Sequence, residues 1–147
     1  MTEQSLEEAI VGELLLLMRQ HRRASRRQHQ ELGISGRQSA ALRYLAQTGP
    51  HTVSEISRYL YISDPSTSEL LDHMQKKGYT KRERCADDNR KVYVSATELG
   101  LETALKTEPG IVGRLREGLP ELSREELEQI NRVLQKLGNM AGLHDRD

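Results

Sequence analysis

Basic side chains gather in the short stretch between Lys76 and Lys91. Seven basic residues (Lys76, Lys77, Lys81, Arg82, Arg84, Arg90 and Lys91) stand against three acidic ones, which leaves a local net charge of +4 in a chain whose total net charge is zero. Lysine and arginine are the side chains that neutralise nucleic-acid phosphates. The distribution of charge matters more than its sum, so this stretch indicates a face that can approach a phosphate backbone.

A pair of short helices is predicted directly before this basic stretch. Thr52 and Glu55 have the spacing of a capping box, in which each side chain satisfies a free backbone N–H, so the first helix begins there. A turn follows. The second helix begins at Ser63 or the next residue, with Pro65 in its first turn and Gly78 at its end. Two helices joined in this way describe a helix-turn-helix, whose second helix can lie in the major groove of DNA.

Two short strands are predicted after the helix pair, over residues 79–85 and 91–95, on either side of the polar turn ADDNR. Such a hairpin, carrying arginine and lysine, can lie along the minor groove or the phosphates. Helix pairs alone occur in many proteins that bind no nucleic acid. The basic hairpin therefore favours a winged helix-turn-helix that binds double-stranded DNA.

The run DDNRKVYVSATELG resembles the wing-to-helix signature of the MarR family, the multiple-antibiotic-resistance type of winged-helix repressor. That family carries Asp-x-Arg in the wing, an alternating apolar strand, and then Thr-x-x-Gly at the start of the next helix. Here these positions are Asp88, Arg90, Val92, Val94, Thr97 and Gly100. The second helix of the pair, SDPSTSELLDHMQKKGY, also resembles the family's recognition helix in its Ser/Thr-rich start and its Lys-Gly end.

The resemblance implies a mainly α fold with a small β-hairpin wing (α+β). It divides the chain into an N-terminal dimerisation helix over 1–35, a winged helix-turn-helix over 36–97 and C-terminal dimerisation helices over 98–147. Ser35 or Gly36 can open a helix that ends before Gly49-Pro50, which would support the helix pair from behind. The long first helix and the last helix, which Ser123 and Glu126 would cap, both carry apolar stripes. These stripes predict a homodimer, or else an antiparallel helix pair within a monomer.

In the second helix, Thr67, Leu70, Leu71 and Met74 are predicted to form a buried stripe. The residues that would contact DNA lie outside this stripe and on the wing. Arg90 is predicted to be the wing-tip arginine, with Asp88 orienting its loop. Glu69 and His73 depart from the family pattern, which often has basic residues there, so the target sequence does not follow from the resemblance. The predicted DNA-binding residues are Ser63, Pro65, Ser66, Ser68, Glu69, His73, Arg84, Asp88, Arg90 and Lys91.

The resemblance also implies a small anionic or aromatic effector, which family members commonly bind between the dimer arms and the winged region. The predicted ligand-binding residues are His21, Ser25, His29 and Tyr44. The five arginines between residues 19 and 27 could hold such an anion or touch the DNA backbone, but charge runs on helices are usually solvated faces. Pro109 interrupts the region after the wing, where the family usually has one long helix.

Several classes of function have no support in the sequence. There is no phosphate-binding glycine loop, no nucleophile elbow and no Cys/His metal spacing, so neither an enzyme nor a cofactor or metal is predicted. Cys85 is the single cysteine. It is predicted to be a small strand residue, and the alternative is a thiol that senses oxidants. No apolar run could span a membrane and no signal peptide is present, which predicts a cytoplasmic location. Two alternatives to a specific repressor remain, a winged helix that binds protein and a sequence-tolerant DNA-binding protein.

Overall fold

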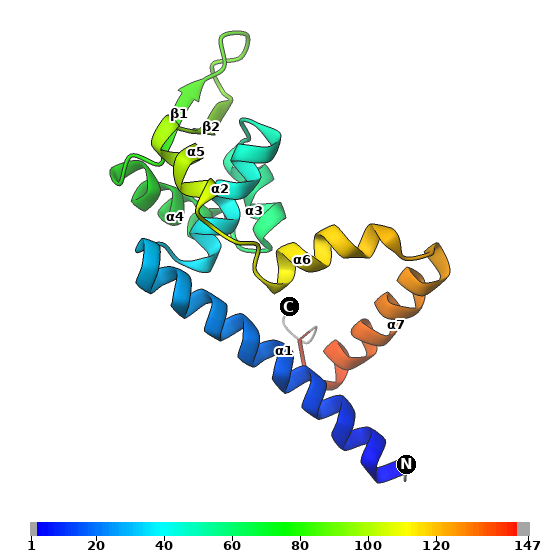
Figure 1. Ribbon diagram of the computed structural model, residues 1–147. Coiled ribbons are helices and arrows are strands. Elements are labelled where there is room, and N and C mark those ends of the chain that lie inside the picture. Colours follow the sequence, from blue (N-terminus) through cyan, green and yellow to red (C-terminus); the bar gives the residue numbers. More distant parts are fainter. Residues whose placement is uncertain (1–2, 144–147) are drawn as a thin grey trace. The chain divides into compact units, whose positions relative to one another are not determined.

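The computed structural model describes residues 3–143, which divide between Ile111 and Val112 into two compact units. The first unit holds α1 (Glu3–Leu32), α2 (Gly36–Thr48), α3 (Val53–Leu60), α4 (Asp64–Lys76), β1 (Thr80–Arg84), β2 (Val92–Ala96) and α5 (Glu98–Leu105) (Figure 1). The second holds most of α6 (Ile111–Gly118), the short 3-10 helix η1 (Leu119–Glu121) and α7 (Arg124–Met140). This confirms the predicted mainly α fold with a β-hairpin. The outermost residues of the two predicted dimerisation regions, 1–2 and 144–147, lie outside the described part of the chain.

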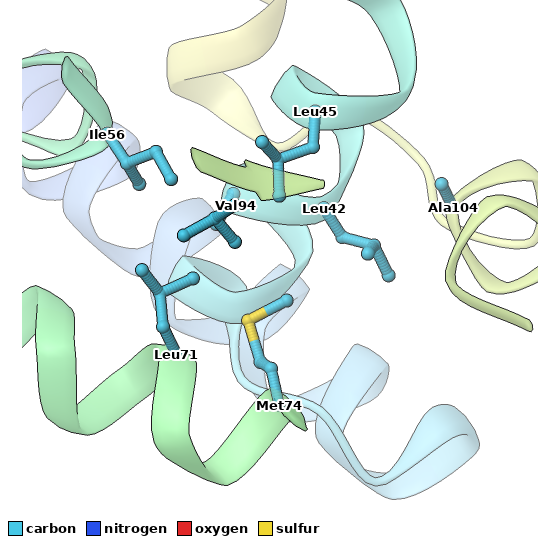
Figure 2. Packing of buried hydrophobic residues seen from close by; sticks show 8 residues of the cluster. Leu42, Leu45, Ile56, Leu71, Met74, Val94 and Ala104 are labelled. Carbon is cyan, nitrogen blue, oxygen red and sulfur yellow. The ribbon is translucent and has the colours of Figure 1, made fainter. Parts of the chain in front are cut away.

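The core of the first unit gathers side chains from four helices and one strand. Leu42 and Leu45 of α2, Ile56 of α3, Leu71 and Met74 of α4, Val94 of β2 and Ala104 of α5 converge on one cluster (Figure 2). All are at most 5% exposed. Burying side chains of this size contributes about 1.5–3 kcal/mol each. The cluster therefore holds the helix pair, the hairpin and α5 together as one unit.

Side-chain caps begin the helices of the pair where the sequence predicts them. Thr52 precedes α3 and closes the capping box with Glu55 in both directions. Ser63 precedes α4, accepts a hydrogen bond from the backbone N–H of Ser66, and is followed by Pro65 in the first turn. Gly78, just beyond α4, has φ of 81°, the left-handed conformation that glycine adopts without strain.

The hairpin pairs β1 with β2 in antiparallel register, from Thr80 opposite Ala96 to Arg84 opposite Val92. A third segment joins this sheet at a single bridge. The backbone N–H of His51 donates to the carbonyl of Val94 at 3.0 Å, and the N–H of Val94 donates back at 2.7 Å. The loop between α2 and α3 is thereby fastened to the strand that passes through the core.

Helix α5 is packed close against the start of the hairpin. It begins after Thr97, whose hydroxyl accepts from the N–H of Gly100. A Cβ added to Gly100 would lie 2.1 Å from the carbonyl oxygen of Tyr79. Only glycine allows this approach of helix to backbone.

The predicted interruption after the wing is present, because α5 ends at Leu105 and α6 begins at Ile111. In the second unit, Ser123 and Glu126 form the predicted capping box at the start of α7. Helix α7 leaves Ile130, Val133 and Leu134 exposed.

Candidate nucleic-acid interface

The turn between α3 and α4 sets the geometry of the helix pair. Tyr61 ends α3 in the left-handed conformation, with φ of 55°. Across the turn, the hydroxyls of Ser57 and Thr67 are hydrogen-bonded at 2.8 Å, and the hydroxyl of Ser54 donates to the Asp64 carboxylate at 3.0 Å. These contacts fix the N-terminal half of α4 against α3.

The start of α4 presents an exposed face. Pro65, Ser66, Glu69 and His73 are all exposed, as expected of residues that read a groove. The hydroxyl of Ser63 also donates to that of Ser66, at 2.9 Å, so Ser63 serves the helix cap in addition to any contact with DNA. The role of these side chains in reading base edges stays a prediction.

Ser68 differs from the other predicted groove residues of α4. It is half-buried, and its carbonyl oxygen accepts a hydrogen bond from the guanidinium of Arg82, at 3.4 Å. The backbone carbonyl of Ser68 is therefore in contact with Arg82 of the hairpin.

The loop of the hairpin projects away from the helices (Figure 1). Arg84, Arg90 and Lys91 are exposed on it. One carboxylate oxygen of Asp88 accepts from the backbone N–H of Arg90 at 3.0 Å. Asp88 therefore shapes the loop backbone and leaves the Arg90 side chain exposed. The guanidinium of Arg84 donates to the carbonyl of Asn89 at 3.4 Å, across the same loop.

The four predicted ligand-binding residues lie on α1 and α2. His21 and His29 are exposed, while Ser25 faces the start of α2, where its Oγ would be 3.2 Å from a Cβ at Gly36. Tyr44 stacks between His51 and Tyr59, with ring centroids 4.3 and 3.8 Å away. A ligand role for these four residues stays a prediction.

His51 makes hydrogen bonds with residues of α2, α3 and β2. Its Nδ1 lies 2.8 Å from a carboxylate oxygen of Glu55 and its Nε2 lies 2.7 Å from Thr48 Oγ1. The side-chain hydrogen bond from His51, followed by the backbone hydrogen bond from Thr52, lowers the pKa of Glu55 below its ordinary value. A negatively charged Glu55 is thus favoured at the positive N-terminus of α3.

Arg82 and His51 make contacts that the sequence does not predict, because Arg82 is expected only as a basic residue of the wing and His51 has no predicted role. Arg82 turns toward α4, where its guanidinium contacts Asp72 at 2.6 Å and Gln75 at 3.2 Å. Alternation along the strand was the available signal, since it places Arg82 on the same face of β1 as the buried Thr80. The partner of His51 in the sheet is 43 positions away along the chain, so no local pattern could indicate it.

Across residues 3–143, no helix is long and apolar enough to cross a membrane. Within the same residues, no group of three or more His, Cys, Asp or Glu side chains is placed to hold a metal ion. Cys85 is a free, half-buried thiol that directly follows β1 and is not part of the strand.

Comparison with known proteins identifies the relatives of this fold. The family model that matches residues 32–91 is that of the MarR family. The helix-turn-helix transcriptional regulator YkoM of Bacillus subtilis is 28% identical over 120 residues, which cover 82% of this chain and 75% of YkoM.

Solved structures extend the likeness over nearly the whole chain. The crystal structure of a MepR–DNA complex from S. aureus is 26% identical, covers 96% of this chain and 99% of that one, and has a TM-score of 0.59. AbsC, a MarR family transcriptional regulator from Streptomyces coelicolor, shares the fold with a TM-score of 0.63 at 22% identity, covering 95% of this chain and 94% of AbsC.

A winged helix-turn-helix with an exposed second helix and a basic wing is the fold of DNA-binding transcriptional regulators such as MepR. Within that class, the chain is similar to the MarR family, whose model matches residues 32–91.

Proposed function

We propose that the protein is a cytoplasmic, homodimeric repressor that binds a pseudo-palindromic promoter site and is released from it by a small anionic or aromatic effector. The observation that carries the DNA-binding part is that the exposed start of α4 and the exposed basic residues of the wing, Arg84, Arg90 and Lys91, belong to the same winged unit. Helix side chains would read base edges in the major groove, and the loop would contact the minor groove or the phosphates.

Exposed apolar side chains support the homodimer. In α1, eight residues between Leu6 and Met18 (Leu6, Ile10, Val11, Leu14, Leu15, Leu16, Leu17 and Met18) are 38–56% exposed in the single chain. In α7, Val133 and Leu134 are each 56% exposed. Contiguous apolar surface of this kind usually marks a protein interface. A two-fold dimer would hold two recognition helices about 34 Å apart, one turn of duplex, which accounts for a pseudo-palindromic site.

Release by an effector is the part of the proposal that rests on family resemblance. Of the predicted ligand-binding residues, Ser25 and Tyr44 are half-buried, and they lie on α1 and α2, which contact each other. The relative MepR is described as a regulator of a multidrug efflux pump, which fits regulation linked to small organic compounds.

The experiment that tests the proposal is selection of bound fragments from sheared DNA of the source genome, at near-physiological salt, followed by sequencing. A repressor of this kind enriches one motif with half-sites a helical turn apart, and discriminates it from random DNA by several kcal/mol, roughly 4 to 10. Genes next to the enriched sites then supply effector candidates, which are scored by their ability to release the protein from the selected duplex.

Two other outcomes would reject sequence-specific repression. Recovery of fragments without a shared motif, with binding that weakens steeply with salt, would indicate a sequence-tolerant DNA-binding protein held by phosphate contacts. Retention of no fragment at any workable salt would indicate that this winged helix binds protein.

A further inference from the structure

The arginines of the hairpin differ in the direction their side chains take. Arg90 and Arg84 lie exposed at the loop and at the adjoining end of β1. Arg82 is in the middle of β1, opposite Val94, which is fully buried. The Arg82 side chain is 28% exposed and contacts α4. Arg82 is therefore turned toward α4, while Arg84 and Arg90 remain exposed.

The guanidinium of Arg82 contacts three successive positions along one face of α4. One terminal nitrogen donates to the Asp72 carboxylate at 2.6 Å and to the Gln75 side-chain oxygen at 3.2 Å. The other donates to the backbone carbonyl of Ser68 at 3.4 Å. Positions 68, 72 and 75 repeat at helical spacing, so one side chain spans two turns of α4. The planar, multiply donating guanidinium suits this arrangement, whereas lysine offers a single point charge.

Leu71 and Met74 hold the inner face of α4 on the core, and the polar contacts at its two ends have other partners than Arg82. At the C-terminal end of α4, the N–H of Tyr79 donates to the Met74 carbonyl at 3.0 Å and the Lys77 ammonium donates to the Gly33 carbonyl at 2.8 Å. At the N-terminal end, Asp64 is bonded to Ser54 of α3. Arg82 contacts the middle turns, and its contacts join them to the strand that leads into the basic loop.

We infer that Arg82, through Asp72, sets the angle between the recognition helix and the wing, and is a positioning residue for DNA recognition instead of a phosphate contact. This inference rests on the proposed DNA interface. A dimer that reads two grooves needs each recognition helix and its wing loop held in one relative orientation, because a helix that rocks against the hairpin would lose base contacts while keeping its charge. We call the contacts of Arg82 with α4 the Arg82 clamp. Loss of this clamp should reduce the discrimination between DNA sequences more than it reduces the affinity for DNA in general.

The first test measures the clamp without DNA. Spin labels are placed on α4 and on the wing loop (Glu69→Cys and Asn89→Cys, with Cys85→Ser), and the labelled protein is diluted with unlabelled protein so that only distances within one chain contribute. The wild-type background should give one narrow distance distribution. Arg82→Ala and Asp72→Asn should each broaden it, and Arg82→Lys should restore it only in part. The matched control is Lys81→Ala, which removes a charge from the same strand where Lys81 pairs with Glu83. An unchanged distribution in Arg82→Ala would overturn the inference.

The second test compares binding of the selected duplex with that of a shuffled duplex of the same composition, over a range of salt. Breaking a charged, partly buried hydrogen bond should lower the ratio of the two affinities by about tenfold in Arg82→Ala and in Asp72→Asn alike. The double variant should be no worse than either single one, since both remove the same contact. Thermal unfolding of each variant checks that it is folded.

A direct contact between Arg82 and a DNA phosphate would give a different result in the second test. If Arg82 is a phosphate contact, Arg82→Ala weakens binding to both duplexes and reduces the salt slope by about one per protomer, while Asp72→Asn strengthens binding to both. A wild-type protein that does not discriminate between the duplexes would reject sequence-specific regulation, and the spin-label distances would still decide the role of Arg82.

Discussion

Arg90 and Gly100 show how single residues serve this interface in different ways. Arg90 is exposed on a loop whose backbone Asp88 holds, and the predicted role of its side chain is in binding DNA. Gly100 has the opposite role, because its missing side chain lets α5 approach the carbonyl of Tyr79.

Substitution of Arg90 by alanine should weaken DNA binding about tenfold, since a wing-tip arginine supplies a charged contact from each protomer. The dimer should stay intact. Affinity is measured by fluorescence anisotropy with the selected duplex, and mass by light scattering. Arg124→Ala is the matched control, because it removes an arginine that is 93% exposed on α7. Unchanged affinity at physiological salt would show that the wing assignment is wrong.

Gly100→Ala should lower the free energy of unfolding by about 2 kcal/mol, because a Cβ there overlaps a backbone oxygen that cannot easily move. Helix propensity alone predicts the reverse sign, a gain of up to about 1 kcal/mol. Urea unfolding decides between them. Gly118→Ala, where an added Cβ meets nothing within 4 Å, should not destabilise the chain. A stabilised Gly100→Ala variant would mean that α5 does not pack against Tyr79 in this way.

At the scale of elements, local patterns in the sequence are enough to predict where most helices begin. They are not enough to predict the contacts between elements. The capping boxes at Thr52 and Ser123 were predicted because all their partners lie within four residues. The strands were predicted to within about one residue, at 79–85 and 91–95 against Thr80–Arg84 and Val92–Ala96. The Ser35–Gln38 capping box was not predicted, although its Ser-x-x-Gln signal is present.

The contacts that orient the elements were out of reach of such patterns. The bridge from His51 to Val94 and the clamp from Arg82 to Asp72 join residues far enough apart that only the folded chain brings them together. A count of basic residues therefore assigned Arg82 to the phosphate-facing charge, whereas the structure places it against α4. The roles of the DNA- and ligand-binding residues stay predictions, since side-chain exposure alone does not specify a ligand.

The cap of α3 should make stability depend on pH. The pKa of Glu55 is lowered in the folded state by its hydrogen bonds with His51 and Thr52. A carboxylate whose pKa is lower in the folded state stabilises the protein fully at pH values above its unfolded-state pKa. That stabilisation is lost as the pH falls through the folded-state pKa. Glu55→Gln keeps a capping acceptor but not the charge.

The stability difference between the wild type and Glu55→Gln should accordingly be present at neutral pH and shrink as the solution is made acidic. Denaturant unfolding of both proteins across this range measures it. Glu126, whose pKa is also lowered by Ser123, is common to both proteins and cancels. A difference that grows on acidification would contradict the charged role of Glu55.

At the scale of the whole molecule, apolar exposure on α1 and α7 is the feature that a single chain does not account for. Two-fold interfaces use each contact twice. Burying a leucine contributes about 1.5–3 kcal/mol, so placing a charge at Leu14 should weaken a dimer by about 3–6 kcal/mol, at least a hundredfold in the dimer dissociation constant.

Leu14→Glu and Val133→Glu should therefore shift the protein from dimer to monomer in size-exclusion chromatography with light scattering, and binding to the selected duplex should fall with them. Both side chains are exposed in the single chain, at 38% and 56%, so helix content should be retained. Gln20→Glu adds the same charge at an exposed polar position of α1 and should leave the mass unchanged. A wild-type monomer at micromolar concentration would reject the homodimer.

The stack of Tyr59, Tyr44 and His51 has a consequence for spectroscopy. The chain contains five tyrosines and neither tryptophan nor phenylalanine, so tyrosine is the source of its near-ultraviolet circular dichroism. Two of the five lie face to face, 3.8 Å apart, and belong to different helices of the winged unit. Near-ultraviolet signals of this kind vanish when side-chain packing is lost, even where helices persist. The protein therefore carries its own optical reporter of how α2 and α3 are packed, and it can be read in the unlabelled molecule while DNA or an effector is added.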